Sequence, residues 1–131
     1  MNPAGSALLD TNIVIAHFRN DRIASAHLES ATSIYLPWVA LGELYYGALR
    51  AQRRETQLAL IRDFLQIATL LLPDQGTTER YGHVKAGLSA AGQPIPDNDI
   101  WIAALALQYD LPVATRDVRF RAIPQLKILE W

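Results

Sequence analysis

Four acidic residues stand where ordinary surface carboxylates are hard to explain, namely Asp10, Glu43, Asp99 and Asp117. Asp10 directly follows the apolar run SALL, and Asp117 follows the strand-like segment PVAT by one residue. Glu43 lies within VALGELYYGAL and Asp99 opens DIWIAALAL, two segments that carry almost no other charge. Because a carboxylate that is buried without a partner is costly, four acids in such positions indicate a shared site.

The chemistry that suits such a cluster is metal-assisted hydrolysis of a phosphodiester. Carboxylates held close together repel one another and raise one another's pKa unless a cation lies among them. The four motifs do not each bring a Lys or Arg to neutralise the acids, so we expect the cation to be a metal ion. Hard oxygen ligands suit Mg²⁺ and Mn²⁺, and such ions lower the pKa of a bound water and stabilise the attacking and leaving oxygens.

Each acid also has an ordinary structural explanation when it is taken alone. Asp10 could cap a helix, and either Asp97 or Asp99 is expected to cap the helix that follows it. Glu43 could face solvent, and Asp117 could be a turn residue, since Asp is common in turns. The shared site is favoured because all four acids occur together in one short chain.

The elements that must position these acids alternate between strands and helices. We expect strands at 6–9, 33–36, 69–72, 112–115 and 127–130, and helices from about 13, over 21–31, from 37 to about 51, and over 54–68, 77–90 and 98–109. Thr11 or Asn12 can cap the first helix. This order predicts an α/β sandwich with a mainly parallel central sheet, in which catalytic groups gather at the carboxyl ends of the strands. Asp10 and Asp117 follow two of those ends.

The composition fits one globular domain and excludes several kinds of site. A length of 131 residues predicts a single domain over 1–131, and a hydrophobic content of 50% argues against disorder. The absence of cysteine excludes disulfide scaffolds, zinc ribbons and thiol nucleophiles. The segment MNPAGSALLDTN lacks the features of a signal peptide, and the longest apolar runs are too short for a bilayer. We therefore expect a soluble, cytoplasmic protein.

With these motifs in place, the sequence resembles the PIN-domain ribonucleases, and among them the VapC-type toxins of bacterial toxin–antitoxin pairs. The segment LLDTNIVI is similar to the family's first strand and acid, and GELYYGA is similar to its E-L-x-x-G helix. NDIWIAALAL is similar to the third acidic motif, VATRDVRF to the last one, and IPQLKILEW to the closing strand. The motifs follow the family's order and spacing along essentially the whole chain. One departure is Arg119, where the family often has His before its Phe.

The resemblance implies a PIN-like three-layer α/β/α sandwich and an endoribonuclease that depends on Mg²⁺ or Mn²⁺. It assigns the metal-binding pocket to four carboxylates: Asp10, Glu43, Asp99 and Asp117. Asp97 stands where an auxiliary acid could help, and Asn12 and Thr115 match polar positions that orient the carboxylates by hydrogen bonds. The resemblance also implies a homodimer and a cognate antitoxin whose C-terminal segment covers the toxin.

The charge of the chain bears on whether RNA can be its substrate. Twelve basic residues stand against thirteen acidic ones, and a net charge of −1 by itself argues against nucleic acid. If metal ions neutralise the four acids, the twelve basic residues stand against only nine acidic ones, which leaves a net charge of +3. Ten of the basic residues are arginine, whose forked head suits phosphate. Arg116, Arg119 and Arg121 flank Asp117 and are candidates for contact with the RNA backbone.

Several alternatives stay open on the sequence alone. His17, His27 and His83 could act as general acid and base without metal, although none follows a strand. A receiver-like domain would need an acidic pair after the first strand, and an aspartyl-nucleophile phosphatase would need Asp where Asn12 stands. A PIN nuclease outside a toxin–antitoxin pair, acting in RNA processing or on single-stranded DNA, and a non-catalytic RNA-binding module also remain.

Overall fold

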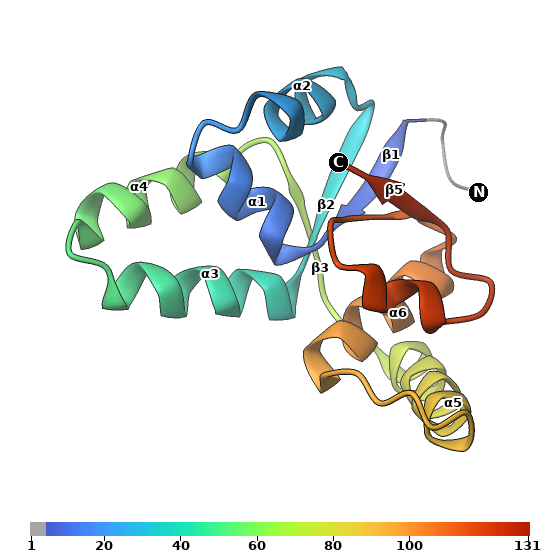
Figure 1. Cartoon of the computed structure of the whole chain (residues 1–131). Coiled ribbons are helices and arrows are strands. Elements are labelled where there is room, and N and C mark those ends of the chain that lie inside the picture. The colour runs from blue at the N-terminus through green and yellow to red at the C-terminus, as the bar shows by residue number, and fades with distance from the viewer. Residues whose placement is uncertain (1–4) are drawn as a thin grey trace.

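The computed structural model describes residues 5–131 and contains the predicted alternation of strands and helices (Figure 1). The strands are β1 (Ser6–Leu9), β2 (Ser33–Pro37), β3 (Thr69–Leu71), β4 (Val113–Thr115) and β5 (Ile128–Glu130). The helices are α1 (Thr11–Phe18), α2 (Arg22–Ser30), α3 (Trp38–Arg50), α4 (Arg54–Phe64), α5 (Gln75–Ala90) and α6 (Asp97–Tyr109), with a 3₁₀ helix η1 (Val118–Ala122). The predicted order of these elements is confirmed, and η1 is the element that the sequence patterns did not predict.

The five strands form one sheet in the order β3-β2-β1-β4-β5, and every neighbouring pair is parallel. Leu8 of β1 pairs with Tyr35 on one side and with Val113 on the other. The chain runs outward from β1 through β2 to β3, then returns to the other side of β1 with β4. The strand order therefore reverses between β1 and β4, and the carboxyl ends of strands at such a switch form the usual ligand crevice of an open α/β sheet.

Helices cover both faces of the sheet, so the molecule has the predicted α/β/α layers. Figure 1 shows α1 to α4 on one side of the sheet and α5 and α6 on the other. Side chains alternate between the faces along each strand. Ala7 and Leu9 of β1 pack in the core with α1 to α4, whereas Leu8 packs with α6 and with Phe120 of η1.

Helix starts differ from the predicted bounds because of capping. Asp10, rather than Thr11 or Asn12, caps α1, which therefore begins two residues before the predicted start. The α5 helix begins at Gln75 instead of 77 because Asp74 and Thr77 form a capping box. The expectation that Asp97 or Asp99 caps α6 is wrong, since the N-cap is Pro96 and makes no side-chain cap bond.

The α4 helix also ends earlier than its apolar stripe predicts, at Phe64 rather than at 68. Backbone N–H groups of Ile67 and Ala68 both donate to the carbonyl of Phe64, which turns the chain toward β3. Ala68 still enters the core after this turn. An apolar residue at helical spacing can thus be buried by a turn as well as by a helix.

Two expectations extend to the first four residues of the chain. The absence of a signal peptide and the single domain over 1–131 both involve residues 1–4, which lie outside the described residues. Within 5–131, no helix is long and apolar enough to cross a membrane.

Candidate active site

Asp10 lies directly after β1 and is buried, with 6% of its surface exposed. Its backbone N–H donates to the carbonyl of Ala114 at 3.0 Å, which ties it to β4. The backbone N–H of Thr11 donates to Oδ1 at 2.8 Å, and the hydroxyl of Thr115 donates to Oδ2 at 2.7 Å. Both carboxylate oxygens are therefore fixed, and the same bonds make Asp10 a helix cap and a site residue at once.

Thr115, the last residue of β4, connects Asp10 to Asp117. Its hydroxyl oxygen accepts the backbone N–H of Asp117 at 2.9 Å while its hydrogen goes to Asp10. The Asp117 carboxylate in turn accepts the backbone N–H of Arg119 at 3.0 Å and caps η1. One buried hydroxyl thus sets the relative position of two candidate metal ligands.

The other two acids come from helices. Glu43 is in the middle of α3, and the hydroxyl of Thr11 donates to its Oε1 at 3.2 Å. Asp99 is in the first turn of α6, with 15% of its side chain exposed. Asn98, its neighbour, lowers the pKa of Glu43 by hydrogen bonding. Sequence patterns did not single out Thr11 or Asn98 as partners of Glu43, although both directly adjoin a candidate acid.

The pKa values show that these carboxylates influence one another. Burial raises the pKa of Asp10, and burial together with the charge of Asp10 raises the pKa of Glu43. Burial, and then the charge of Asp10, raises the pKa of Asp99 to about 6. Hydrogen bonding to Arg119 lowers the pKa of Asp117 instead. Asp10, Glu43, Asp99 and Asp117, which together are called the acidic pocket, are therefore close enough that each raises the pKa of another or has its own pKa raised by another.

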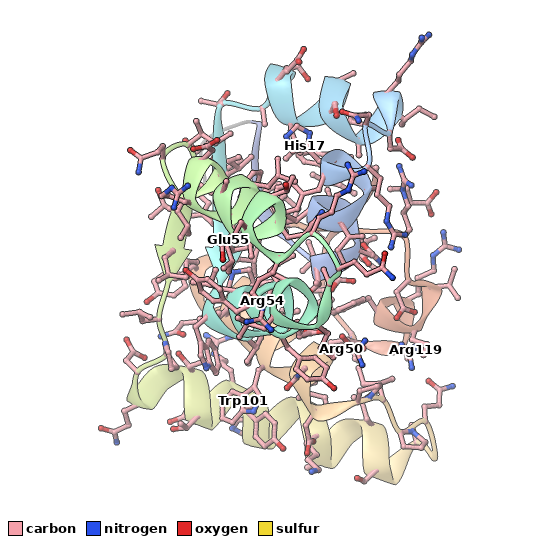
Figure 2. All side chains as sticks on the ribbon, turned by 90° about the vertical axis from the view of Figure 1, so that its left-hand side faces the viewer. His17, Arg50, Arg54, Glu55, Trp101 and Arg119 are labelled. Carbon is pink, nitrogen blue, oxygen red and sulfur yellow. The ribbon has the colours of Figure 1, made fainter. Side chains whose placement is uncertain are left out.

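Arg119 lies beside two of these acids, a contact that the sequence patterns did not predict. Its Nη2 atom is 2.6 Å from Oδ2 of Asp117 and 3.6 Å from Oδ2 of Asp99, and its Nε also donates to Asp117. Figure 2 shows this side chain on the η1 segment. One arginine thus reaches two of the four acids, and the expectation of a metal ion stays a prediction.

The pocket suits a hard divalent cation in its donor type. Its four acids offer only oxygen atoms, and three of them have pKa values raised by burial, an environment that a cation would relieve. Across residues 5–131, however, no three His, Asp or Glu side chains are close enough to hold one ion. The carboxylates therefore match Mg²⁺ or Mn²⁺ in donor chemistry, but no three of them are close enough to coordinate the same ion. The Arg119 guanidinium lies beside Asp117 and Asp99.

Three other predicted site residues form ion pairs with groups outside the four acids. Asp97 accepts hydrogen bonds from Tyr81 and Lys85 of α5, at 2.9 and 3.0 Å. Arg116 pairs with Asp21 and with the backbone carbonyl of Trp131, and Arg121 pairs with Glu130. Each of these groups has an ionic partner of its own.

No hydrogen bond joins Asn12 or any of the three histidines to the four acids within residues 5–131. The buried Oδ1 atom of Asn12 has no hydrogen-bond partner in the described part of the chain. The hydroxyl that donates to Glu43 is that of Thr11. His17 bonds to Ser25 and packs against Phe64, and His27 stacks on Trp131. His83 lines a separate cavity on the α5 side. The structure does not bring the histidines together as an acid–base pair.

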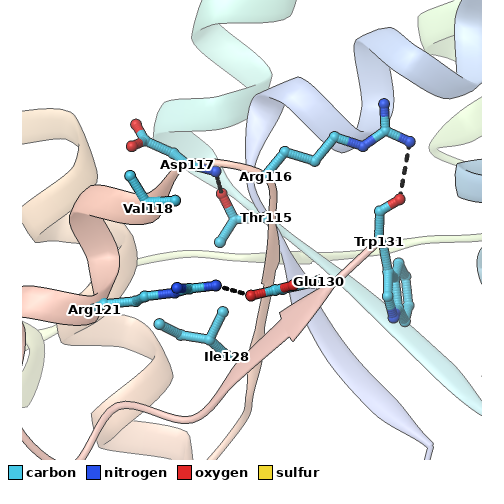
Figure 3. A pocket seen from close by; sticks show the side chains of 8 residues that line it. All are labelled: Thr115, Arg116, Asp117, Val118, Arg121, Ile128, Glu130 and Trp131. Atoms are coloured by element: carbon cyan, nitrogen blue, oxygen red, sulfur yellow. Dashed lines mark hydrogen bonds and ion pairs between the residues drawn. The ribbon is translucent and has the colours of Figure 1, made fainter.

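Two of the acids each line a cavity, Asp117 one and Glu43 another. One, of about 250 Å³, includes Asp117 among its lining residues and is drawn in Figure 3. Its rim carries the Arg121–Glu130 pair and the bond from Arg116 to Trp131. The other, of about 270 Å³, is lined by Glu43, by apolar residues that include Leu44 and Ile61, and by Arg19 and Gln57. Each of these two acids therefore faces a hollow of the surface.

Replacing Thr115 with Val should destabilise the protein by about 2 kcal/mol, because the buried Asp10 carboxylate loses a hydrogen bond that a methyl group cannot replace. Urea unfolding at pH 7 measures this change. Thr69→Val, on the exposed surface of β3, removes the same hydroxyl and should change the free energy of unfolding by less than about 0.5 kcal/mol. Equal effects of the two substitutions would show that the Thr115 hydroxyl has no special part.

Comparisons with known proteins cover the whole of this architecture. The model of the family described as PIN domain matches residues 7–126. Ribonuclease VapC2 of Haemophilus influenzae is 34% identical over 127 residues, which are 95% of this chain and 96% of that protein.

Two solved structures are similar along almost their full length. DNA-bound VapBC from Salmonella typhimurium matches with a TM-score of 0.89 at 28% identity, over 96% of this chain and 98% of that one. VapBC-5 from Mycobacterium tuberculosis, a member of the VapBC family of toxin–antitoxin systems, matches with a TM-score of 0.76 at 26% identity, over 97% and 99%. The range matched by the family model includes all four pocket acids.

Proposed function

The chain belongs to the PIN domain family, and on this premise we propose that it is a metal-dependent endoribonuclease that acts as the toxin of a toxin–antitoxin pair. The observation that carries the proposal is the acidic pocket at the carboxyl ends of β1 and β4. Four carboxylates from four separate elements meet there, and burial raises the pKa of three of them. A fold gains no stability from such a cluster, so a ligand for it is the simplest explanation.

In this proposal Asp10 and Asp99 bind a divalent cation directly, and Glu43 and Asp117 complete its surroundings. Mg²⁺ or Mn²⁺ would supply there the Lewis acid and the positive charge that phosphodiester hydrolysis requires. Thr115 and the backbone of Thr11 keep the Asp10 carboxylate in one orientation, so its oxygens need no reorganisation when the substrate arrives.

In this proposal Glu43 orients the attacking water, and the hydrogen bond from the Thr11 hydroxyl restrains its carboxylate. The water would attack the phosphorus in line and leave a 5′-phosphate and a 3′-hydroxyl. The cavities lined by Asp117 and by Glu43 are the proposed places for the RNA on either side of the scissile phosphate.

The proposed partners are a cognate antitoxin and a second copy of this chain. The likeness to VapBC structures supports an antitoxin, since one chain of each shares this fold and VapBC-5 belongs to a family of toxin–antitoxin systems. The acidic pocket supports one feature of such a partner, a basic side chain that would reach the carboxylates. The homodimer rests on the family resemblance.

The proposed function predicts RNA cleavage that depends on added metal. We expect the purified protein to cut RNA in Mg²⁺ or Mn²⁺, and EDTA to slow cleavage by at least about tenfold, because the carboxylates alone cannot activate water. Gel analysis of labelled RNA, with single-stranded DNA as a parallel substrate, measures both. Returning Mn²⁺ in excess over EDTA should restore cleavage. Activity that survives EDTA would contradict the proposal and favour a route through His17, His27 or His83.

A further inference from the structure

The Arg119 guanidinium makes its ionic contacts with the acidic pocket alone among the described residues. It pairs with Asp117 through Nη2 and Nε, and its Nη2 is 3.6 Å from Asp99. Its two neighbouring arginines are paired elsewhere, Arg116 with Asp21 and Arg121 with Glu130. Of these three arginines, Arg119 is the one whose charge lies against the candidate metal ligands.

The position of Arg119 follows from how η1 is anchored. Phe120 is fully buried in the core beside α6, and the Asp117 carboxylate accepts the backbone N–H of Arg119. These contacts fix the backbone at residue 119, while 54% of the Arg119 side chain is exposed. The backbone is thus held at the rim of the pocket, and the side chain has solvent into which it can move.

We propose that Arg119 is an internal counter-ion of the acidic pocket, which competes with a divalent metal ion for Asp117 and Asp99 and leaves both carboxylates when the metal binds. This inference rests on the proposed function, because it needs a metal ion in that pocket. In the absence of metal, the guanidinium offsets part of the repulsion between the carboxylates. A divalent ion carries twice its charge and coordinates carboxylate oxygens directly, so the two cations cannot share the same oxygens.

The relative strengths of the two interactions favour displacement. An ion pair formed by a largely exposed arginine contributes little to stability, since solvent screens it and the side chain loses freedom to form it. A divalent ion that binds Asp99 together with Asp10, as the proposed function has it, gains from both carboxylates at once. Arg119 is therefore a weak competitor, which lowers metal affinity without abolishing it.

The test is Mn²⁺ binding to the full chain without RNA, with free Mn²⁺ measured by electron paramagnetic resonance. We expect Arg119→Gln to bind Mn²⁺ with a Kd roughly three- to tenfold lower than the wild type, because a positive charge next to two ligands is gone. Arg119→Lys, which keeps the charge but loses the fork, should fall between the two. Arg121→Gln is the matched control. It removes the same charge only two residues along the chain, but from a side chain that pairs with Glu130 and not with the acidic pocket. Its Kd should stay within about twofold of the wild type.

A second measurement follows the side chain itself. In ¹⁵N-labelled protein, the Nε–H signal of Arg119 should move toward the position of a free arginine as Mg²⁺ is added, because Nε loses its bonds to Asp117. The Nε–H signal of Arg121 should stay in place. A signal from Arg119 that does not move as Mg²⁺ saturates the protein would overturn the inference.

The outcomes separate this inference from the proposed function. If Arg119→Gln binds Mn²⁺ no more tightly than the wild type, while Asp10→Asn abolishes binding, Arg119 is not a competitor and the metal site stands. If the wild type and Arg119→Gln both fail to bind Mn²⁺, the metal site and the inference fall together. Binding by Arg119→Gln but not by the wild type would support the inference most strongly.

Discussion

Asp10→Asn should reduce RNA cleavage by at least about a hundredfold, which exceeds the roughly 10- to 100-fold loss that follows removal of a partner of a metal ligand. Asp10 is the most buried of the four acids, and Thr11 and Thr115 donate hydrogen bonds to its two carboxylate oxygens. Asn keeps the size of the side chain but removes the negative charge that would hold the cation. Steady-state kcat/KM on a labelled RNA in Mn²⁺ measures the loss.

The matched control for this substitution is Asp63→Asn, which removes a carboxylate from the exposed surface of α4. We expect kcat/KM for this variant within about twofold of the wild type, because the removed charge is remote from the pocket and screened by solvent. Thermal unfolding of both variants checks that each is folded. Cleavage by a folded Asp10→Asn protein at the wild-type rate would reject the assignment of the active site.

The fold and the meeting of the acids could be predicted from local features of the sequence. Short apolar runs that end at an acid specify a strand and the place of its carboxyl end, and the parallel order of β1 and β4 then follows from the alternation with helices. Asp10 and Asp117 are neighbours for that reason. Their hydrogen-bond link through Thr115 could not be predicted, because it depends on side-chain geometry across two strands.

The position of Asp97 illustrates a different limit. Asp97 and Asp99 are two residues apart in the first turn of α6, and residues at this spacing point in nearly opposite directions from a helix. Only one of them can face the pocket, and Asp97 instead meets Lys85 on α5. Helical geometry predicts that Asp97 and Asp99 cannot both face the pocket. Which of the two faces it depends on how α5 and α6 pack together.

The role of Arg119 as a counter-ion could not be predicted, for a related reason. Its spacing from Asp117 indicates only that the two are close along the chain, and the approach to Asp99 requires η1 to pack against α6. No apolar periodicity predicts a 3₁₀ helix of five residues, so the direction of its side chains could not be derived. Pairings across elements decide how the charges of the site are balanced.

Asp99→Asn should stabilise the metal-free protein at pH 7.5, even though the same substitution removes a proposed metal ligand. Burial and the charge of Asp10 raise the pKa of Asp99 from 3.8 to about 6. Between these values the folded chain holds a proton that the unfolded chain has released, so stability from this group falls as pH rises through that window and stays low above it. The full difference between these two pKa values corresponds to about 3 kcal/mol in the free energy of unfolding. We expect about 1 to 2 kcal/mol, because solvent partly screens the pocket.

Urea unfolding in EDTA at pH 4 and pH 7.5 measures this effect for the wild type, Asp99→Asn and the Asp63→Asn control. The gain from Asp99→Asn should be large at pH 7.5 and small at pH 4, where Asp99 is protonated in the folded protein and carries no charge to remove. Asp63→Asn should change the free energy of unfolding by less than about 0.5 kcal/mol at both pH values, because its side chain lies on the exposed surface of α4. A loss of stability in Asp99→Asn at pH 7.5 would mean that Arg119 stabilises the Asp99 carboxylate by more than burial and Asp10 destabilise it.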